Sequence, residues 1–471
     1  MDDEDAEWDE LVGVIRMQMN NNILLVMNME RDLQNRVAQH QNFRNRRRCR
    51  RTIYDHDRAL ACIYNDFFGI YPRFRDRDFV SMFRLSRSRM ERLIQDILND
   101  GNEFFRRNSD GTGNLGASTE AKILLPIKTF AFGVAPHAFS DYFQMSRTLA
   151  RKCCKQYAHT MKRIYSNEYL RLPSSMDLKN VSKLHYKKHG VPGVFGSLDC
   201  MHVYWKNCPK AWNGSYKKGA KAFGPSLVLE ALSDHHLWFW HASFGYAGSL
   251  NDLNILNLSP LLASLCDGTF ADLEREAIPF TIAGEEFFWM LVLVDGIYPA
   301  YSRFVKSFGQ PVTVEESNFA AWQESARKDI ERAFGVLQAK FQILSRPLLG
   351  IVLSDISNIV ACCIIMHNMC VSDRVMGDVN MYYNPAYSFE EVEENQDEVL
   401  VEADMNDEQR ERNHTMVGLQ NGNPNVIDNV LGREEFRYWN HLNDRGEHRR
   451  LHDALIRAVN EMYRREHDNN D

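Results

Sequence analysis

The segment from Phe195 to Trp205 constrains the fold more than any other part of the sequence. It is rich in apolar and aromatic residues, and it holds a single acid, Asp199, near its middle. This composition predicts a β-strand. A carboxylate in such a strand is costly to remove from water unless another group compensates its charge. We therefore expect a compensating partner beside Asp199.

Two later acids occupy comparable positions in the pattern. Asp295 follows the apolar run 289–294, and Glu331 lies in an amphipathic helix expected over 326–344. Two carboxylates about 4 Å apart repel by roughly 4 kcal/mol at an effective dielectric constant of about 20. Three converging acids would therefore not all ionise without cations. Carboxylate oxygens favour Mg²⁺ or Mn²⁺, and two such ions can activate water or a 3′-hydroxyl for phosphodiester displacement and stabilise the leaving oxygen.

The expected helix over 326–344 has an apolar stripe at helical spacing. The stripe consists of Ile330, Ala333, Phe334, Leu337, Phe341 and Leu344. Arg327 precedes Glu331 by one helical turn, so it can orient this acid or contact a phosphate. An ordinary surface ion pair is the alternative interpretation. Gly335, one turn after Glu331, would let a neighbouring element approach closely.

The segments around these acids alternate between strands and helices. Residues 226–232 and 237–242 are largely apolar and flank a short polar turn, which predicts a β-hairpin. A helix is expected over 254–265, followed by the strand that ends at Asp295. This order predicts an α/β domain with a mixed sheet. Asp199 would lie in the first strand. Asp295 would end the fourth strand, which we expect to be the central neighbour of the first.

The chain of 471 residues is long enough for several domains. We predict a polar and basic N-terminal arm over 1–55, a helical domain over 56–185, a catalytic domain over 190–375, an acidic disordered linker over 376–430 and a C-terminal helical segment over 431–471. The net charge of −7 does not indicate nucleic-acid binding by the chain as a whole. The arm nevertheless has six arginines within 44–51. They predict a nuclear-localisation or phosphate-contacting patch, or else a solvated linker.

Ten cysteines in a chain of this length do not indicate a disulfide framework, so we expect a reducing compartment. We find no apolar run as long as a membrane span, and the acidic start is unlike a secretory signal. Two groups of Cys and His residues lack the paired spacing of zinc fingers, and we interpret them as core residues. They are Cys200, His202 and Cys208, and Cys363, His367 and Cys370.

Residues 139–152 resemble a helix-turn-helix within the predicted helical domain. Ser146 is placed to cap its second helix. That helix carries four basic residues, Arg147, Arg151, Lys152 and Lys155. A DNA-contacting helix and a helix packed in a bundle are both compatible with this pattern. Earlier in the same domain, Ser86 is a plausible cap for a helix with Met90, Leu93, Ile94 and Ile97 at helical spacing.

The loop 206–221 follows the Asp199 strand and interleaves basic, aromatic and glycine residues. We predict that it contacts nucleic acid, because lysines attract phosphate and aromatic rings stack on unpaired bases. A solvated hairpin loop is the alternative. The residues assigned to this interface are Lys206, Lys210, Trp212, Lys217 and Lys218, with Arg327 from the later helix.

Several motifs in this order resemble the PIF/Harbinger transposases, specifically their plant transposon-protein branch and the domesticated Harbinger-derived nucleases. The motifs lie at 196–202 (GSLDCMH), 205–209 (WKNCP), 229–231 (LEA), 248–256 (GSLNDLNIL), 294–299 (VDGIYP), 326–338 (ARKDIERAFGVLQ) and 365–369 (IMHNM). The resemblance covers roughly residues 80–375. It departs from many relatives at Gln338, where they have a lysine, and Lys340 is a candidate substitute.

The resemblance implies an RNase H-like fold with an Asp-Asp-Glu site for two Mg²⁺ or Mn²⁺ ions. Asp199, Asp295 and Glu331 match this triad, and 35 residues separate the last two, a spacing typical of such enzymes. Asp252 lies in another family motif and is a rival for the middle acid. We prefer Asp295 because it ends a buried strand, whereas Asp252 lies in a loop suited to capping the following helix.

The resemblance also implies a nuclear enzyme that cuts DNA at terminal inverted repeats and joins the ends to a target. Such proteins usually act with a separate Myb-like DNA-binding protein, and a homo-oligomer is a further expectation. A different class remains open: a domesticated, non-catalytic scaffold associated with DNA or chromatin. The long acidic and helical extensions favour that alternative, because they could recruit partners.

Overall fold

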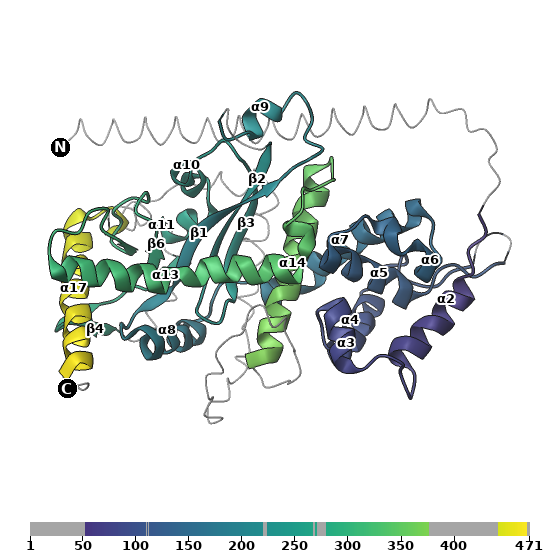
Figure 1. Cartoon of the computed structure of the whole chain (residues 1–471), viewed down its shortest axis with the longest axis horizontal. Helices are drawn as coiled ribbons and strands as arrows, with labels where there is room; N and C mark the ends of the chain where they lie inside the picture. The colour runs from purple at the N-terminus through teal and green to yellow at the C-terminus, as the bar shows by residue number, and fades with distance from the viewer. Residues whose placement is uncertain are drawn as a thin grey trace.

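The computed structural model describes residues 52–109, 111, 113–219, 224–266, 269–270, 279–375 and 441–468. The predicted acidic linker over 376–430 lies outside these residues, as does the N-terminal arm apart from its last four positions. The arginine cluster at 44–51 is therefore not described. In Figure 1 a group of helices lies on one side of the molecule and a sheet with its covering helices on the other.

The helical part is formed by the first half of the described chain. Its elements are α2 (His56–Ile63), η1 (Tyr64–Phe68), α3 (Asp76–Phe83), α4 (Arg87–Asn99), α5 (Thr119–Phe132), η2 (Pro136–Phe139), α6 (Ser140–Phe143) and α7 (Arg147–Tyr169). The Ser86 cap is confirmed, since its Oγ accepts a hydrogen bond from the Arg89 N–H at 3.2 Å. The four apolar residues predicted to line α4 are all buried.

The segment resembling a helix-turn-helix forms a very short helix followed by a long one. Ser146 caps α7 as predicted, and its Oγ accepts from the Leu149 N–H at 3.2 Å. The preceding helix, α6, has only 4 residues, whereas α7 has 23. The α7 helix packs against α5 and against α14 (Leu353–Val375), and Lys155 forms an ion pair with Asp355. Packing of this helix is thus observed, and a contact with DNA stays a prediction.

The predicted mixed sheet is confirmed. Its strands are β1 (Val194–Tyr204), β2 (Ser226–Ser233), β3 (Phe239–Ala247), β6 (Leu291–Val294) and β7 (Phe304–Lys306), in the order β3-β2-β1-β6-β7. The first three strands are antiparallel, whereas β6 pairs in parallel with β1 and β7 with β6. As predicted, β2 and β3 form a hairpin, and β6 is the central neighbour of β1. A separate small hairpin joins β4 (Phe280–Ile282) to β5 (Glu285–Phe287).

Helices cover the sheet and connect it to the helical part. The long helix α13 (Val314–Lys340) packs against β1, and α17 (Arg445–Asp468) packs against α13. The α8 helix (Ser175–His189) also contacts β1, and α14 lies between the sheet and the helical part (Figure 1). The remaining short elements are α9 (Asn213–Tyr216), α10 (Asp252–Asn257), α11 (Pro260–Cys266) and η3 (Gln342–Leu344).

Two helices differ from their predicted limits for local chemical reasons. The α13 helix begins at Val314, twelve residues earlier than predicted, because Thr313 and Glu316 form a capping box. It ends at Lys340, and the rest of its predicted span forms the short η3 helix. The helix predicted over 254–265 is two helices, α10 and α11. The second starts at Pro260, which has no N–H to continue the helical hydrogen bonds of the first.

The α14 helix is the only described helix that is long and apolar enough to cross a membrane. This differs from our expectation that no run reaches that length. In the structure, 67% of its most apolar window is buried inside the protein. Core helices of folded domains meet the same criterion of length and composition, so this single helix is weak support for a membrane span.

Candidate active site

The register of the sheet places Asp199 and Asp295 on neighbouring strands. In the parallel pair, Ser197 of β1 lies opposite Leu293 of β6. Asp199 and Asp295 each follow two residues later, Asp199 within β1 and Asp295 directly after β6. The register shifts by one residue between Val194 and Gly196, and the recorded pairing ends at Ser197 and Leu293. The two acids therefore lie near each other where β6 ends, and the charge of Asp295 acts on the pKa of Asp199.

Arg327 of α13 connects Asp199 to Glu331. Its Nη1 lies 3.1 Å from Asp199 Oδ2, and its Nη2 lies 3.0 Å from Glu331 Oε1. The Arg327 and Asp199 side chains are only 17% and 24% exposed. This guanidinium is the compensating partner expected for Asp199, and it makes a three-member ionic network rather than an isolated surface pair.

The acids near Asp199 influence its protonation. Burial raises the pKa of Asp199, while the N–H of Cys200, at 2.7 Å from Oδ1, and the guanidinium of Arg327 act to lower it. Negative charge on Asp252 and Asp295 raises this pKa further. Both rivals for the middle acid are therefore close enough to act on Asp199.

Asp252 has a different local role from the one predicted. Asn251, not Asp252, caps α10, because its Oδ1 accepts from the Asn254 N–H at 2.8 Å. Asp252 is the first residue of the helix and is half-buried. Its carboxylate is thus not occupied in capping, and the reason for preferring Asp295 is weakened.

The three acids matched to the triad are not gathered into one tight cluster. Among the described residues, one group of three potential ligands has all its donor atoms within 4.8 Å of one another, and it does not include them. The Glu331 side chain is 50% exposed, and Asp295 is exposed with its Oδ1 2.6 Å from the Gly296 N–H. Like-charge repulsion opposes closer approach of these carboxylates unless cations lie between them.

Comparison with known proteins identifies the relatives of this chain. The family described as plant transposon protein matches residues 167–378, which include all the candidate acids. The chain is 21% identical over 307 residues to the ALP1-like protein of Arabidopsis thaliana, covering 64% of this chain and 73% of that one. It is also 21% identical over 257 residues to human HARBI1, which is named as a candidate nuclease, covering 54% and 67% respectively. No solved structure matches.

Residues 167–378 are thus similar to the plant transposon protein family, and both relatives support a relationship to Harbinger-derived transposases and nucleases. The resemblance found in the motifs is thereby confirmed. The α/β class is confirmed by the sheet.

The loop after β1 is organised by a buried aromatic cluster. Trp205 is fully buried, and Trp212 and Tyr216 are only 6% and 8% exposed. Their ring centroids lie 5.2 to 6.1 Å apart. The predicted stacking of Trp212 on a nucleic-acid base is therefore wrong for this structure, because the ring already packs in the protein interior.

The lysines of this loop remain compatible with phosphate contact. Lys206, Lys210 and Lys218 are exposed, and Lys217 is half-buried. Burial lowers the pKa of His202 in β1. The charge of Lys218 lowers this pKa further, and the charge of Asp252 raises it. The basic loop therefore lies close to the acids, although Ala220–Phe223 at its end are outside the described residues.

Two residues of the α13 motif differ from their predicted roles. Nothing lies within 4 Å of the position where Gly335 would carry a side chain, so no neighbouring element approaches there. Lys340, the candidate substitute for the family lysine, is 6% exposed, and burial lowers its pKa. A buried ammonium is not available to a DNA phosphate, so this substitution is not supported.

In the part of the chain that the structure describes, neither Cys and His group brings three potential ligand atoms within 4.8 Å of one another. His367 is fully buried, and its Nε2 pairs with the Leu237 carbonyl oxygen at 2.8 Å. A different group, formed by His185, His189 and Asp329, was missed from the sequence. Its signal was the His-x-x-x-His spacing at 185–189, which puts both rings on one face of a helix.

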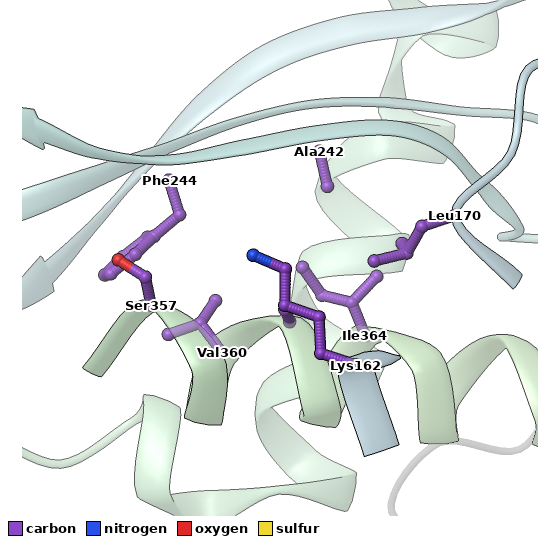
Figure 2. Close-up of a pocket in the computed structure, with 8 residues that line it drawn as sticks. Lys162, Leu170, Ala242, Phe244, Ser357, Val360 and Ile364 are labelled. Carbon is purple, nitrogen blue, oxygen red and sulfur yellow. The ribbon is translucent and has the colours of Figure 1, made fainter. Parts of the chain in front are cut away.

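A small cavity lies between α7, α14 and β3, with the Lys162 side chain extending into it (Figure 2). Its volume is about 30 Å³, enough for one or two water molecules. The other lining residues are mostly apolar, and burial lowers the pKa of Lys162. The cavity is too small for a nucleotide or cofactor, and none of the candidate acids lines it.

Proposed function

We propose that this protein is a metal-dependent DNA transposase or endonuclease with an RNase H-like catalytic domain. It would cut phosphodiester bonds at transposon ends and join those ends to target DNA. The observation that carries the proposal is the contact of Arg327 with both Asp199 and Glu331, at a point where the negative charges of Asp252 and Asp295 also act on Asp199. The strand order, with three antiparallel strands followed by two parallel ones, supports the RNase H-like assignment.

Asp199, Asp295 and Glu331 would hold two Mg²⁺ or Mn²⁺ ions, with Asp252 as the rival for the middle position. The donor set fits hard cations because it consists of carboxylate oxygens. The pKa of Asp199, raised by burial and by Asp252 and Asp295, supports the fit, since cations would relieve that negative charge. When bound, such ions activate the attacking oxygen and stabilise the leaving oxygen.

The chain's own side chains have positioning roles around these acids. The Cys200 N–H and Arg327 hold the two oxygens of Asp199 in place. Arg327 also orients Glu331 and has the planar donor geometry suited to a phosphate. Lys206, Lys210, Lys217 and Lys218 would contribute sequence-independent attraction for the DNA backbone.

The decisive experiment measures cleavage of DNA that carries the inverted repeats flanking the gene, with Mg²⁺ or Mn²⁺ added. We expect cleavage by the wild type and its loss in Asp199→Ala, with Asp453→Ala, an exposed acid on α17, as the matched control. Equal cleavage by Asp199→Ala and the wild type would reject the proposed chemistry. Parallel Asp252→Ala and Asp295→Ala variants identify the second essential acid.

A second function, a domesticated non-catalytic scaffold on DNA or chromatin, is favoured by one observation. The Arg327 guanidinium pairs with both Asp199 and Glu331, an arrangement that also suits a purely structural ion network. Unchanged biological function in a double variant, Asp199→Ala with Glu331→Ala, would favour the scaffold.

The remaining parts of the proposal concern location and partners. A nuclear protein with a net charge of −7 would gain sequence recognition from a separate Myb-like DNA-binding protein. Self-association is a further part of the proposal. Co-purification with the Myb-like protein encoded by the same element, and light scattering with and without DNA, test these two partners.

A further inference from the structure

A buried histidine cluster lies where α8, the β2–β3 turn and α13 meet. His185 and His189, one turn apart on α8, and Asp329 of α13 have potential ligand atoms that all lie within 4.8 Å of one another. The rings of His185 and His189 are 5.7 Å apart and nearly parallel. Their separation in sequence from Asp329 is large, so the fold itself assembles this group.

His185 is the unusual member of the cluster. It is fully buried, and neither Nδ1 nor Nε2 has a hydrogen-bond partner. Leaving a buried polar group unpaired costs about 1–3 kcal/mol, and native proteins rarely leave such groups without a partner. An unpaired imidazole nitrogen in such a position can donate its lone pair to a metal ion.

Asp329 is held in place by groups on both of its oxygens. Oδ2 lies 2.9 Å from His235 Nδ1 and 3.5 Å from His189 Nε2, and Oδ1 accepts from Arg332 Nη2 at 2.5 Å. The side chain is only 3% exposed, and the Arg332 guanidinium balances its charge. A charged oxygen thus faces two imidazoles in a site from which water is largely excluded.

We propose that His185, His189 and Asp329 bind a Zn²⁺ ion that is distinct from the ions of the acidic site. Two imidazole nitrogens and one carboxylate oxygen form a donor set that binds zinc in preference to magnesium. His235 orients the carboxylate, as partners of ligating groups commonly do in zinc sites. Three protein ligands leave the fourth position of a tetrahedral ion for solvent.

The ion would fix the position of α13 relative to α8 and the sheet. Asp329 is two residues from both Arg327 and Glu331, and two residues correspond to about 200° around a helix. The zinc ligand and the two acidic-site residues therefore lie on opposite faces of α13. A zinc ion on one face would keep α13 from rotating about its axis. It would thereby keep Arg327 and Glu331 directed toward the acidic site on the opposite face.

The test uses the full-length protein, stripped of metal with a chelator and reloaded with Zn²⁺. Bound zinc per chain is measured by mass spectrometry after gel filtration, and Co²⁺ replaces Zn²⁺ for absorption spectroscopy. We expect about one zinc ion per chain and the visible bands of tetrahedral cobalt. His185→Ala and Asp329→Asn should each weaken zinc binding by at least about 100-fold.

Two control variants locate the bound ion. His137→Ala changes an exposed histidine of η2, and Asp199→Ala changes the acidic site; both should keep the zinc and the cobalt spectrum. Folding is checked by circular dichroism. If the folded wild type binds no zinc or gives no tetrahedral cobalt spectrum, or if His185→Ala and Asp329→Asn retain the ion, the proposal is overturned. These outcomes are independent of DNA cleavage, so zinc binding and nuclease activity can fail separately.

Discussion

The two faces of α13 carry acids in opposite environments. On one face, Glu331 is half-exposed and shares Arg327 with Asp199, beside further carboxylates. On the other, Asp329 is almost fully buried among imidazole rings. An acid among carboxylates and solvent suits hard ions that exchange with water and substrate, whereas an acid among imidazoles suits a tightly held ion. Neighbouring positions on one helix can thus serve two different kinds of chemistry.

The largest expected effect concerns catalysis on the exposed face. Glu331→Gln should lower the rate of Mg²⁺-dependent DNA cleavage by about 10³-fold, since several kcal/mol of transition-state stabilisation depend on each metal ligand. Glu91→Gln, an exposed glutamate of α4, is the control and should cleave like the wild type. Kinetics on DNA bearing the flanking repeats provide the measurement. A rate within a few-fold of wild type for Glu331→Gln would remove this residue from the catalytic set.

Binding of zinc at the buried face of α13 should raise the stability of the folded protein. An ion present at 100 times its dissociation constant stabilises the folded state by about 2.7 kcal/mol, which raises the melting temperature by roughly 3 °C for a chain of 471 residues that unfolds as one unit. Calorimetry of the metal-free protein with and without Zn²⁺ measures the shift. His185→Leu should abolish it. Leucine also removes the two unpaired nitrogens, so without zinc the variant should be no less stable than the wild type. An equal zinc shift in both proteins would contradict the assignment.

The Arg327 network should contribute a smaller amount of stability. Arg327→Ala leaves Asp199 partly buried without its cation, and we expect a loss of about 1–2 kcal/mol in the free energy of unfolding. The loss of stability is limited because Asp199 can take up a proton and become neutral. Urea denaturation is the measurement. Arg106→Ala removes an exposed pair with Glu103 and should cost less than about 0.5 kcal/mol. Equal effects for the two variants would mean that the Arg327 network is an ordinary surface pair.

The smallest effect concerns the start of α8, far along the helix from its histidines. Burial acts to raise the pKa of Asp177, but hydrogen bonds from Arg171 and Ser174 outweigh it, and the net pKa is lowered from 3.8. Asp177→Ala should therefore cost about 1 kcal/mol at neutral pH. Because the folded-state pKa lies below the unfolded one, this contribution is complete above 3.8 and lost as pH falls below it. Denaturation at pH 7 and pH 3 tests this; a difference between the proteins that persists unchanged at pH 3 would contradict it.

Much of the architecture was predictable because it depends on local pattern. Alternation and apolar runs located β1, the β2–β3 hairpin and β6, and the Ser86 and Ser146 caps start their helices where predicted. The limits of α13 were less predictable, since its capping box lies well before the apolar stripe. Burial of Trp212 was not predictable either, because an aromatic residue in a basic loop suits a nucleic-acid surface and a small core equally well.

The sequence by itself determined which residues can form the strand around Asp199, the helix around Glu331 and the family motifs that connect them. Each depends on neighbours within a few turns or on the order of residues along the chain. Only the tertiary structure decided that Arg327 meets Asp199 and that His185 and His189 face Asp329. These contacts join segments more than a hundred residues apart, and local propensity holds no information about which side chains such segments bring together.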